Sequence, residues 1–246
     1  ASGANAIGEA YRLIKHGYSD SMLAGGTEAP ISELLFHGWC RMRVMTTHND
    51  DPAKAMRPFS KDRDGIVLSE AAAVVVLEEM ESARARGAKI YAEICGYGSS
   101  NDAYHLVAPS IEGQTLALTR CLEDAELPSE AVDYVNAHGT ATQLNDPTET
   151  QVVKNVLGDK AYKTPISSIK PMVGHSLGAA GALECVACAQ IFQNNLLPAT
   201  INLNEPDPAC DLDYVPETAR SAEPEVILSN SFGFGGNNAV LCFRRA

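Results

Sequence analysis

The feature that most constrains the fold of this chain is the alternation of short apolar segments with segments of helical spacing. Stretches of strand length include "DSMLAGG", "AAAVVVLEE", "KIYAEICGYGS", "VDYVNAHG", "TPISSIK", "EVILSNSF" and "NAVLCFRR", and helical patterns separate most of them. This order is typical of α/β folds, in which helices cover a largely parallel, buried sheet. The last two stretches follow each other directly, so they predict an antiparallel hairpin at one margin of the sheet.

The first helical segment, "ASGANAIGEAYRLI", is unusually rich in alanine and glycine. Ile7, Tyr11 and Ile14 keep a helical spacing until Gly17 ends the pattern. A helix with so few side-chain atoms can lie very close to another backbone. "GHSLGAAGALECVACAQIFQN" shares this property, and we expect at least one of these helices to be buried between sheets.

Composition limits the class of protein and its partners. The 246 residues are 45% hydrophobic and 20% charged, which suits one compact globular unit. The net charge of −12 argues against nucleic acid or an anionic membrane surface as the main partner. No apolar run reaches the roughly 18 residues that a membrane-spanning helix needs.

The seven cysteines are odd in number, lie mostly within apolar stretches and show no paired metal spacing. They fit a reducing, cytoplasmic compartment and predict no metal site. Cys185 and Cys188 form the one C-x-x-C pattern, on a strongly apolar helix, where core packing is favoured over redox or zinc chemistry.

Positive charge gathers in one loop-rich stretch, "RMRVMTTHNDDPAKAMRPFSKDRD". Its cations are Arg41, Arg43, Lys54, Arg57, Lys61 and Arg63. Interspersed aspartates make a solvated loop one interpretation, and a docking patch for an acidic partner is the other.

Three glycine-flanked stretches lie where a predicted strand ends or a helix begins, which is where functional loops of α/β folds gather. They are "NAHGTATQLNDPTE", "SSIKPMVGHSLGAAG" and "NSFGFGGNN". His138 follows a strand and His175 precedes a small-residue helix, whose positive dipole end would lower the pKa of that imidazole. Two neutral imidazoles converging on one carbonyl oxygen would stabilise an enolate, although a structural role for His138 alone is equally compatible with its pattern.

Two other chemistries lack support in these motifs. "SFGFGG" has Asn238 where a dinucleotide-binding loop needs its third glycine, and no helix follows it. A zinc hydrolase would need a motif such as H-E-x-x-H, which is absent. Thr140 and Thr142 could bind a substrate amide or satisfy their own turn.

Taken together, the motifs resemble the β-ketoacyl-acyl carrier protein synthases of the thiolase superfamily, in particular the elongating type II enzymes of fatty acid synthesis. The matching stretches, spread over nearly the whole chain, are "AGGTEA", "RPFSKDRDG", "KIYAEICGYGSSNDAYH", "NAHGTATQLNDPTE", "KPMVGHSLGAAG", "TINLNEPDPACDLDYVP" and "NSFGFGGNNA". The resemblance implies a layered α-β-α-β-α fold, with residues 1–87 as the end of the N-terminal half and 88–246 as the C-terminal half.

The resemblance also implies a reaction and a set of site residues. In this family malonyl-carrier protein loses carbon dioxide, and the enolate attacks an acyl group held on a cysteine. His138 and His175 would bind the malonyl thioester oxygen, with Lys170 supporting them and Glu149 behind. Thr140 and Thr142 would bind the phosphopantetheine arm of the carrier. No cofactor beyond that arm is implied.

Further residues follow from the same resemblance. Phe232 would gate the acyl pocket and contribute its backbone N–H to an oxyanion hole, with Gly233, Phe234 and Gly235 completing the substrate-binding loop and its glycines allowing movement. Arg41 and Arg43 would dock the acidic acyl carrier protein, which favours the docking interpretation of the basic stretch. A homodimer is implied as well.

The sequence departs from the family pattern at "SEAAA", where glycines are usual, and at Ile169, where threonine or serine is usual. The family's catalytic cysteine stands directly before the residues matching "ASG". We therefore expect that cysteine, within an N-terminal ketosynthase segment, to come from outside this chain, and the isolated chain to be inactive. A decarboxylase-only or non-catalytic partner subunit, a carrier-binding scaffold, and a polyketide rather than fatty acid pathway stay open as alternatives.

Overall fold

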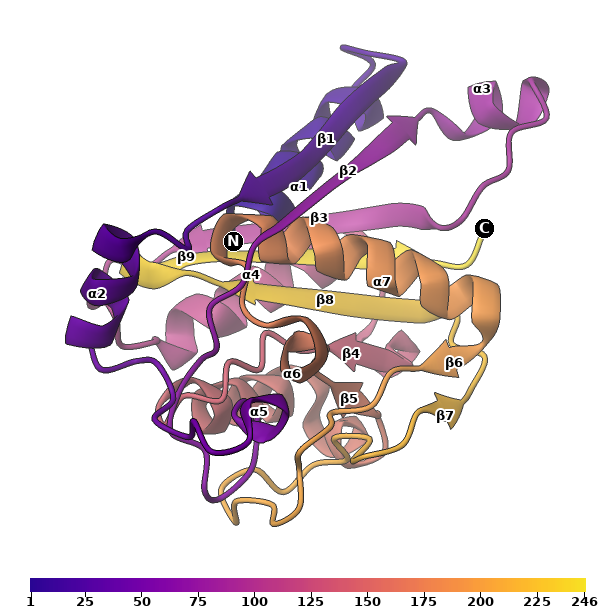
Figure 1. Ribbon diagram of the computed structural model, residues 1–246. Coiled ribbons are helices and arrows are strands. Elements are labelled where there is room, and N and C mark those ends of the chain that lie inside the picture. Colours follow the sequence, from indigo (N-terminus) through magenta and orange to yellow (C-terminus); the bar gives the residue numbers. More distant parts are fainter.

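The computed structural model describes residues 1–246 and centres on a five-stranded mixed sheet (Figure 1). The strand order is β3-β9-β8-β4-β5. The strands are β3 (Glu93–Asn101), β9 (Asn237–Arg244), β8 (Val226–Phe232), β4 (Tyr134–Asn136) and β5 (Ile166–Ser167). The pairs β4–β5 and β4–β8 are parallel, whereas β8–β9 and β3–β9 are antiparallel.

This topology corrects two predictions. The sheet is mixed rather than largely parallel, and the β8–β9 hairpin lies at its centre rather than at a margin. All seven residues of β8 are buried, because β9 and β4 flank the strand and helices pack on both faces of the sheet. The two strands are adjacent in the sequence, so the sequence predicts that they pair with each other. It does not indicate that β8 also pairs with β4 on its other side.

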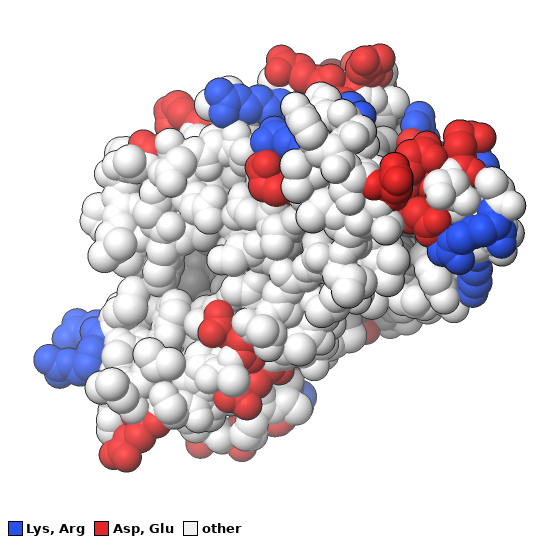
Figure 2. All heavy atoms as spheres, turned by 90° about the horizontal axis from the view of Figure 1, so that it is seen from above, with Lys and Arg blue, Asp and Glu red and all other residues white.

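A second sheet contains only β1 (Ser21–Glu28) and β2 (Ala71–Glu78), which pair antiparallel. Although its sequence is a continuous apolar run, β2 is not buried on both faces, because its residues alternate between partly buried and exposed positions. Leu23, Val74 and Val76 are 65–72% exposed on the outer face of this pair. Seen from above, the surface over this pair is largely uncharged (Figure 2).

The two sheets sandwich α1 (Ser2–Lys15) and α7 (Ala180–Asn194), as Figure 1 shows. On the opposite face of the large sheet lie α4 (Ile111–Asp124) and α5 (Asn145–Leu157). One apolar core of 22 residues lies beneath α4 and α5, and another of 16 lies between the sheets. The expected buried helix is thus confirmed, together with four of the five expected layers.

The remaining elements are short and connect these layers. They are α2 (Glu33–Arg41), α3 (Met80–Ala85), α6 (Lys170–Val173), β6 (Leu196–Leu197), β7 (Arg220–Ser221) and the 3₁₀ turns η1 (Pro52–Lys54), η2 (Ser129–Ala131), η3 (Gly158–Tyr162), η4 (Leu177–Ala179) and η5 (Phe234–Gly236). None of the helices combines the length and the apolar character that a membrane crossing requires.

The close approach predicted for the first helix is confirmed between α1 and α7. A Cβ added to Gly3 would lie 2.8 Å from the backbone nitrogen of Ala182, and one added to Gly181 would lie 2.7 Å from that of Ala4. Distances below 3 Å force backbone atoms apart. Glycine at these positions therefore lets the two helices touch and brings the start of α1 to the centre of the molecule.

Replacing Gly3 or Gly181 by alanine is expected to lower the free energy of unfolding by about 1–3 kcal/mol, because each added methyl group overpacks a backbone contact. Gly38 is the matched control, since it lies in α2 with nothing within 4 Å of an added Cβ. Alanine there should be neutral or stabilising by up to about 1 kcal/mol, through its helix propensity. Urea unfolding of the three variants tests this difference, and equal effects would contradict it.

Candidate active site

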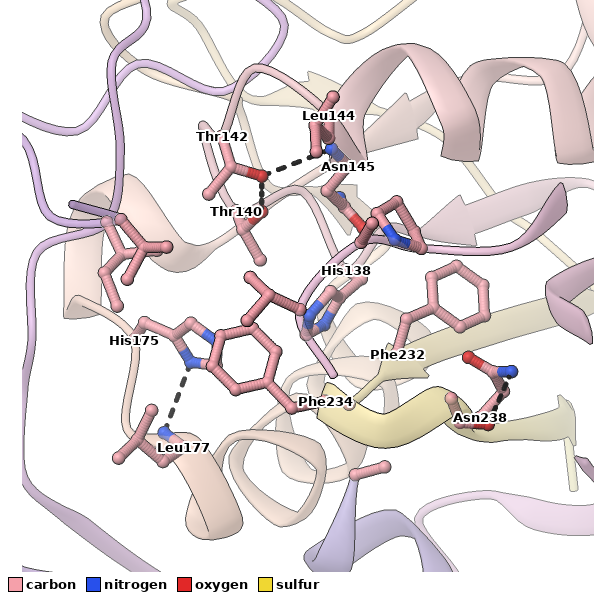
Figure 3. Close-up of a pocket in the computed structure, with 18 of the residues that line it drawn as sticks. His138, Thr140, Thr142, Leu144, Asn145, His175, Leu177, Phe232, Phe234 and Asn238 are labelled. Carbon is pink, nitrogen blue, oxygen red and sulfur yellow. Dashed lines mark hydrogen bonds between the residues drawn. The ribbon is translucent and has the colours of Figure 1, made fainter. Parts of the chain in front are cut away.

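A cavity of about 370 Å³ opens where the ends of several elements meet. It is bordered by the start of α1, by the loops after β4 and β8, and by the turn before η4 (Figure 3). Most of the predicted site side chains line it, namely His138, Thr140, Thr142, His175, Phe232, Gly233, Phe234 and Arg43. Residues distant in the sequence are therefore brought to one place.

The start of α1 forms one wall of this cavity. Ala1 and Ser2 border the cavity, and a Cβ added to Gly233 would lie 3.5 Å from the Ala1 nitrogen. The helix N-terminus, with its partial positive charge, thus adjoins the loop after β8. The cysteine expected directly before Ala1 stays a prediction.

His138 lies just beyond the carboxyl end of β4, where the chain turns at Gly139 with a φ of +42°. Glu149 on α5 holds this turn, because its carboxylate accepts the backbone N–H groups of His138 and Gly139, both at 2.8 Å. Asn230 of β8 donates to the same carboxylate at 3.0 Å. Glu149 therefore acts on the backbone of His138 rather than on its ring.

Lys170 fixes the ring of His138. Its Nζ donates to the His138 carbonyl oxygen at 2.6 Å and lies 3.4 Å from His138 Nδ1. An ammonium group can only donate, so Nδ1 is the acceptor and the ring proton belongs on Nε2. Lys170 is buried and pairs with Glu184, a carboxylate that is itself only 2% exposed.

Glu184 was missed by the sequence analysis. It lies on α7 in the apolar stretch "ALECVACAQ", and its carboxylate also accepts a hydrogen bond from Ser231 at 3.5 Å. The sequence did offer a signal, which was a single acid in an otherwise apolar helix. A buried charge needs a partner of opposite sign, so this acid pointed to a buried cation nearby. Asn230 of β8, which donates a hydrogen bond to Glu149, was also missed.

His175 faces His138 across the cavity, with ring centroids 5.4 Å apart and planes at 84°. Its backbone is held by Val67 and Ser69 of the loop before β2, at 2.7 and 3.1 Å. The backbone N–H of Leu177 donates to His175 Nδ1 at 3.2 Å, drawn as a dashed line in Figure 3. This contact also leaves the ring proton on Nε2.

Both imidazoles are held neutral. Burial is the main cause that lowers the pKa of each ring well below its ordinary value, and the Lys170 charge lowers it further. The helix-dipole explanation for His175 is therefore wrong in its cause, since α7 begins five residues later, at Ala180. The site holds two neutral N–H donors in one cavity.

Thr140 and Thr142 lie side by side on the wall between His138 and α5 (Figure 3). Their hydroxyl oxygens are 2.9 Å apart, and Thr142 Oγ1 accepts the backbone N–H of Asn145 at 3.2 Å. Each hydroxyl can still exchange a hydrogen bond with a ligand. This wall suits a ligand that carries amide groups.

The two phenylalanines after β8 occupy different positions. Phe232 is 7% exposed and packs edge-on against His138, with ring centroids 5.8 Å apart. Phe234 is 43% exposed and stacks on Trp39 of α2 at 5.6 Å. Gly235, which directly follows Phe234, adopts a φ of +72°. The gating role of Phe232 stays a prediction.

The basic stretch divides into paired and free cations. Lys54, Arg57, Lys61 and Arg63 each form an ion pair with an aspartate or glutamate, and Arg63 is buried. Arg41 and Arg43 are exposed and form no ion pair. Within this stretch, Arg41 and Arg43 are therefore the two cations available to an acidic partner, and Arg43 lines the cavity.

Cys185 and Cys188 are 4% and 0% exposed within the core between the sheets, so their predicted packing role is confirmed. Burial raises the pKa of both thiols. They belong to the interior of α7 and do not line the cavity.

Two family models match the chain. Residues 1–83 match the N-terminal domain of β-ketoacyl synthase, and residues 91–204 match its C-terminal domain. A 3-oxoacyl-[acyl-carrier-protein] synthase 2 from Synechocystis sp. is 50% identical over 247 residues, which are 100% of this chain and 59% of that protein. The chain thus spans about three fifths of the length of the curated relatives it matches.

Solved structures agree with these matches. A type II polyketide synthase ketosynthase, solved in complex with its acyl-carrier protein and bound to a hexaketide, has a TM-score of 0.96 and 38% identity, covering 99% of this chain and 60% of that one. The ishigamide ketosynthase/chain length factor has a TM-score of 0.93 and 40% identity, covering 100% and 59%. The expected fold is therefore confirmed.

Proposed function

Because this chain belongs to the β-ketoacyl synthase family, we propose that it supplies the malonyl-binding machinery of a condensing enzyme. The reaction is a decarboxylative Claisen condensation between malonyl-acyl carrier protein and an acyl thioester. The observation that carries the proposal is the pair of neutral imidazoles, each held as the Nε2–H tautomer, in one cavity.

The proposed chemistry follows from what these donors can stabilise. Loss of carbon dioxide from the malonyl group leaves an electron pair that becomes an enolate, with negative charge on the thioester oxygen. In this proposal the Nε2–H groups of His138 and His175 bind that oxygen, and burial strengthens the interaction. The α-carbon then forms a bond to the acyl carbonyl carbon, and the thiolate of the acyl-bearing cysteine leaves.

The delivery of the substrate is part of the same proposal. An acyl carrier protein would dock near Arg41 and Arg43, and its phosphopantetheine arm would pass the Thr140 and Thr142 hydroxyls to reach the imidazoles. The chain would need no other cofactor. The relative solved with its acyl-carrier protein supports such a partner, and the homodimer implied by the resemblance is proposed with it.

A condensation assay tests the function. The protein that carries these residues is given malonyl-carrier and acyl-carrier protein, and products are identified by mass spectrometry. A β-ketoacyl product supports the proposal. Acetyl-carrier protein alone would show decarboxylation without condensation, which is the alternative function. If neither product forms, the proposal is wrong.

The docking step makes a separate prediction. Replacing Arg41 and Arg43 together by glutamate should raise the KM for malonyl-carrier protein about tenfold or more, because rim charges steer an acidic partner. The kcat at saturation should change little. Arg84→Glu in α3, another exposed arginine, is the matched control, and an equal rise in KM for that variant would overturn the assignment.

A further inference from the structure

Arg63 is a fully buried cation that the proposed reaction does not use. It is 2% exposed, lies in the loop between η1 and β2, and does not line the cavity. We propose that Arg63 is a positioning residue that fixes the two-threonine wall of the cavity, so that the hydroxyls of Thr140 and Thr142 meet an amide-bearing arm. This inference rests on the proposed function.

The guanidinium group spans two parts of the chain. Towards the wall, Nε donates to the Thr142 carbonyl at 3.0 Å and Nη2 donates to the Gln143 carbonyl at 3.2 Å. On its other side, Nη1 donates to the Ser60 carbonyl at 2.9 Å and to Asp207 at 2.6 Å. Four hydrogen bonds thus use most of its five N–H groups.

The main chain of Arg63 completes the connection. The side-chain amide of Gln143 donates to the Arg63 carbonyl oxygen. The carbonyls of Thr142 and Gln143 are therefore bound on the side of the wall away from the cavity. The threonine hydroxyls therefore remain free to hydrogen-bond to each other, to the Asn145 N–H and to a ligand.

The backbone of the wall needs such support. Ala141, between the two threonines, adopts a φ of +64°, a left-handed conformation that is unfavourable for alanine. A strained conformation persists only where surrounding contacts determine it. Arg63 binds the next two carbonyls along the chain, so it holds the segment in which the strain occurs.

The charges around Arg63 explain why an arginine occupies this place. Asp207 balances one edge of the guanidinium group, and the fully buried Asp146 lies 3.7 Å from Nε. Asp146 also accepts the backbone N–H of Phe59 at 2.8 Å. A planar fork can reach two carbonyls and a carboxylate in fixed directions, whereas a lysine ammonium cannot.

The test compares two malonyl thioesters. One is malonyl-carrier protein, whose arm carries amides, and the other is a malonyl ester of a simple alkyl thiol without amides. Arg63→Lys keeps the charge but loses the fork. We expect a KM about tenfold higher for the carrier substrate, with kcat within about threefold, because misplaced binding groups weaken a bound arm. The amide-free thioester should show less than a twofold change in KM.

A second readout does not depend on turnover. Backbone hydrogen exchange in residues 140–145 should become faster in Arg63→Lys, while exchange in α4 stays unchanged. If the unmodified protein shows no condensation, the proposed function fails, and the exchange experiment still decides whether Arg63 holds this wall. Unchanged exchange would overturn the inference.

Two further variants exclude a general loss of stability. Lys61→Gln in the same loop, at an exposed ion pair with Glu205, should leave both substrates unaffected. The double variant Thr142→Ala/Arg63→Lys should raise the KM for the carrier substrate no more than the more damaging single substitution does, because both substitutions remove the same binding function. Equal losses for both thioesters, or additive effects of the two substitutions, would reduce Arg63 to a structural residue.

Discussion

Replacing His138 or His175 by alanine is expected to lower kcat for condensation by about 100-fold or more, since each variant removes one of two donors to the enolate oxygen. Binding of the carrier should persist, because Arg41 and Arg43 are untouched. The measurement is a steady-state assay of β-ketoacyl product, combined with carrier binding by calorimetry. A variant that keeps a tenth of the original kcat would contradict the role of that histidine.

The pH dependence offers an independent check of the same site. Protonated imidazole would lose the Nδ1 acceptor that Lys170 or the Leu177 N–H requires. Burial and the Lys170 charge hold both pKa values well below the ordinary 6.5. We therefore expect kcat to stay level as pH falls from 7 to 6 and to decline only below that range. A decline centred at 6.5 would show that the rings are solvated.

Replacing Lys170 by methionine is expected to reduce the free energy of unfolding by about 3–5 kcal/mol, because the buried Glu184 carboxylate loses its partner. Urea unfolding at pH 7 measures this loss. Changing Glu184 to leucine as well should restore most of the stability. The double variant should still condense poorly, since nothing then fixes the His138 ring.

The single variant has a predictable pH response. Burial already raises the pKa of Glu184 above its ordinary 4.5, and the Lys170 charge opposes that rise. Without Lys170 the folded-state pKa rises further, so the folded state favours the neutral acid. Stability of Lys170→Met should then increase as pH falls from 7 towards 5 and decrease as pH rises. A variant whose stability does not change over this range would contradict the buried, unpaired carboxylate.

Local pattern predicted much of this molecule. Gly3, Gly181 and the alanines around them indicated helices that touch, and the structure has α1 against α7 with no room for a Cβ. His138 and His175 were found because each stands beside a glycine at an element boundary. These features could be predicted because they depend on the size of individual residues and on their spacing over a few positions, and both can be read from the sequence.

Other features depend on contacts between distant segments. The position of β8 at the sheet centre was missed. Two strands that follow each other in the sequence predict a hairpin, but they do not show which other strands pair with the outer sides of that hairpin. Glu184 was overlooked because its partner, Lys170, lies across the site and not along its own helix face. The number of free cations in the basic stretch was overestimated from the sequence, because the acids that pair with Lys61 and Arg63 lie more than 140 residues away along the chain.

The sequence by itself determined the family resemblance, the layered α/β class, the buried glycine-rich helices and most of the candidate residues that line the cavity. Tertiary structure alone decided how those residues are held. Lys170 and the Leu177 N–H place the imidazole protons on Nε2, burial rather than a helix dipole lowers the histidine pKa values, and Arg63 binds the back of the threonine wall. Proton positions, desolvation and long-range pairing depend on distances between segments, and only the folded chain sets those distances.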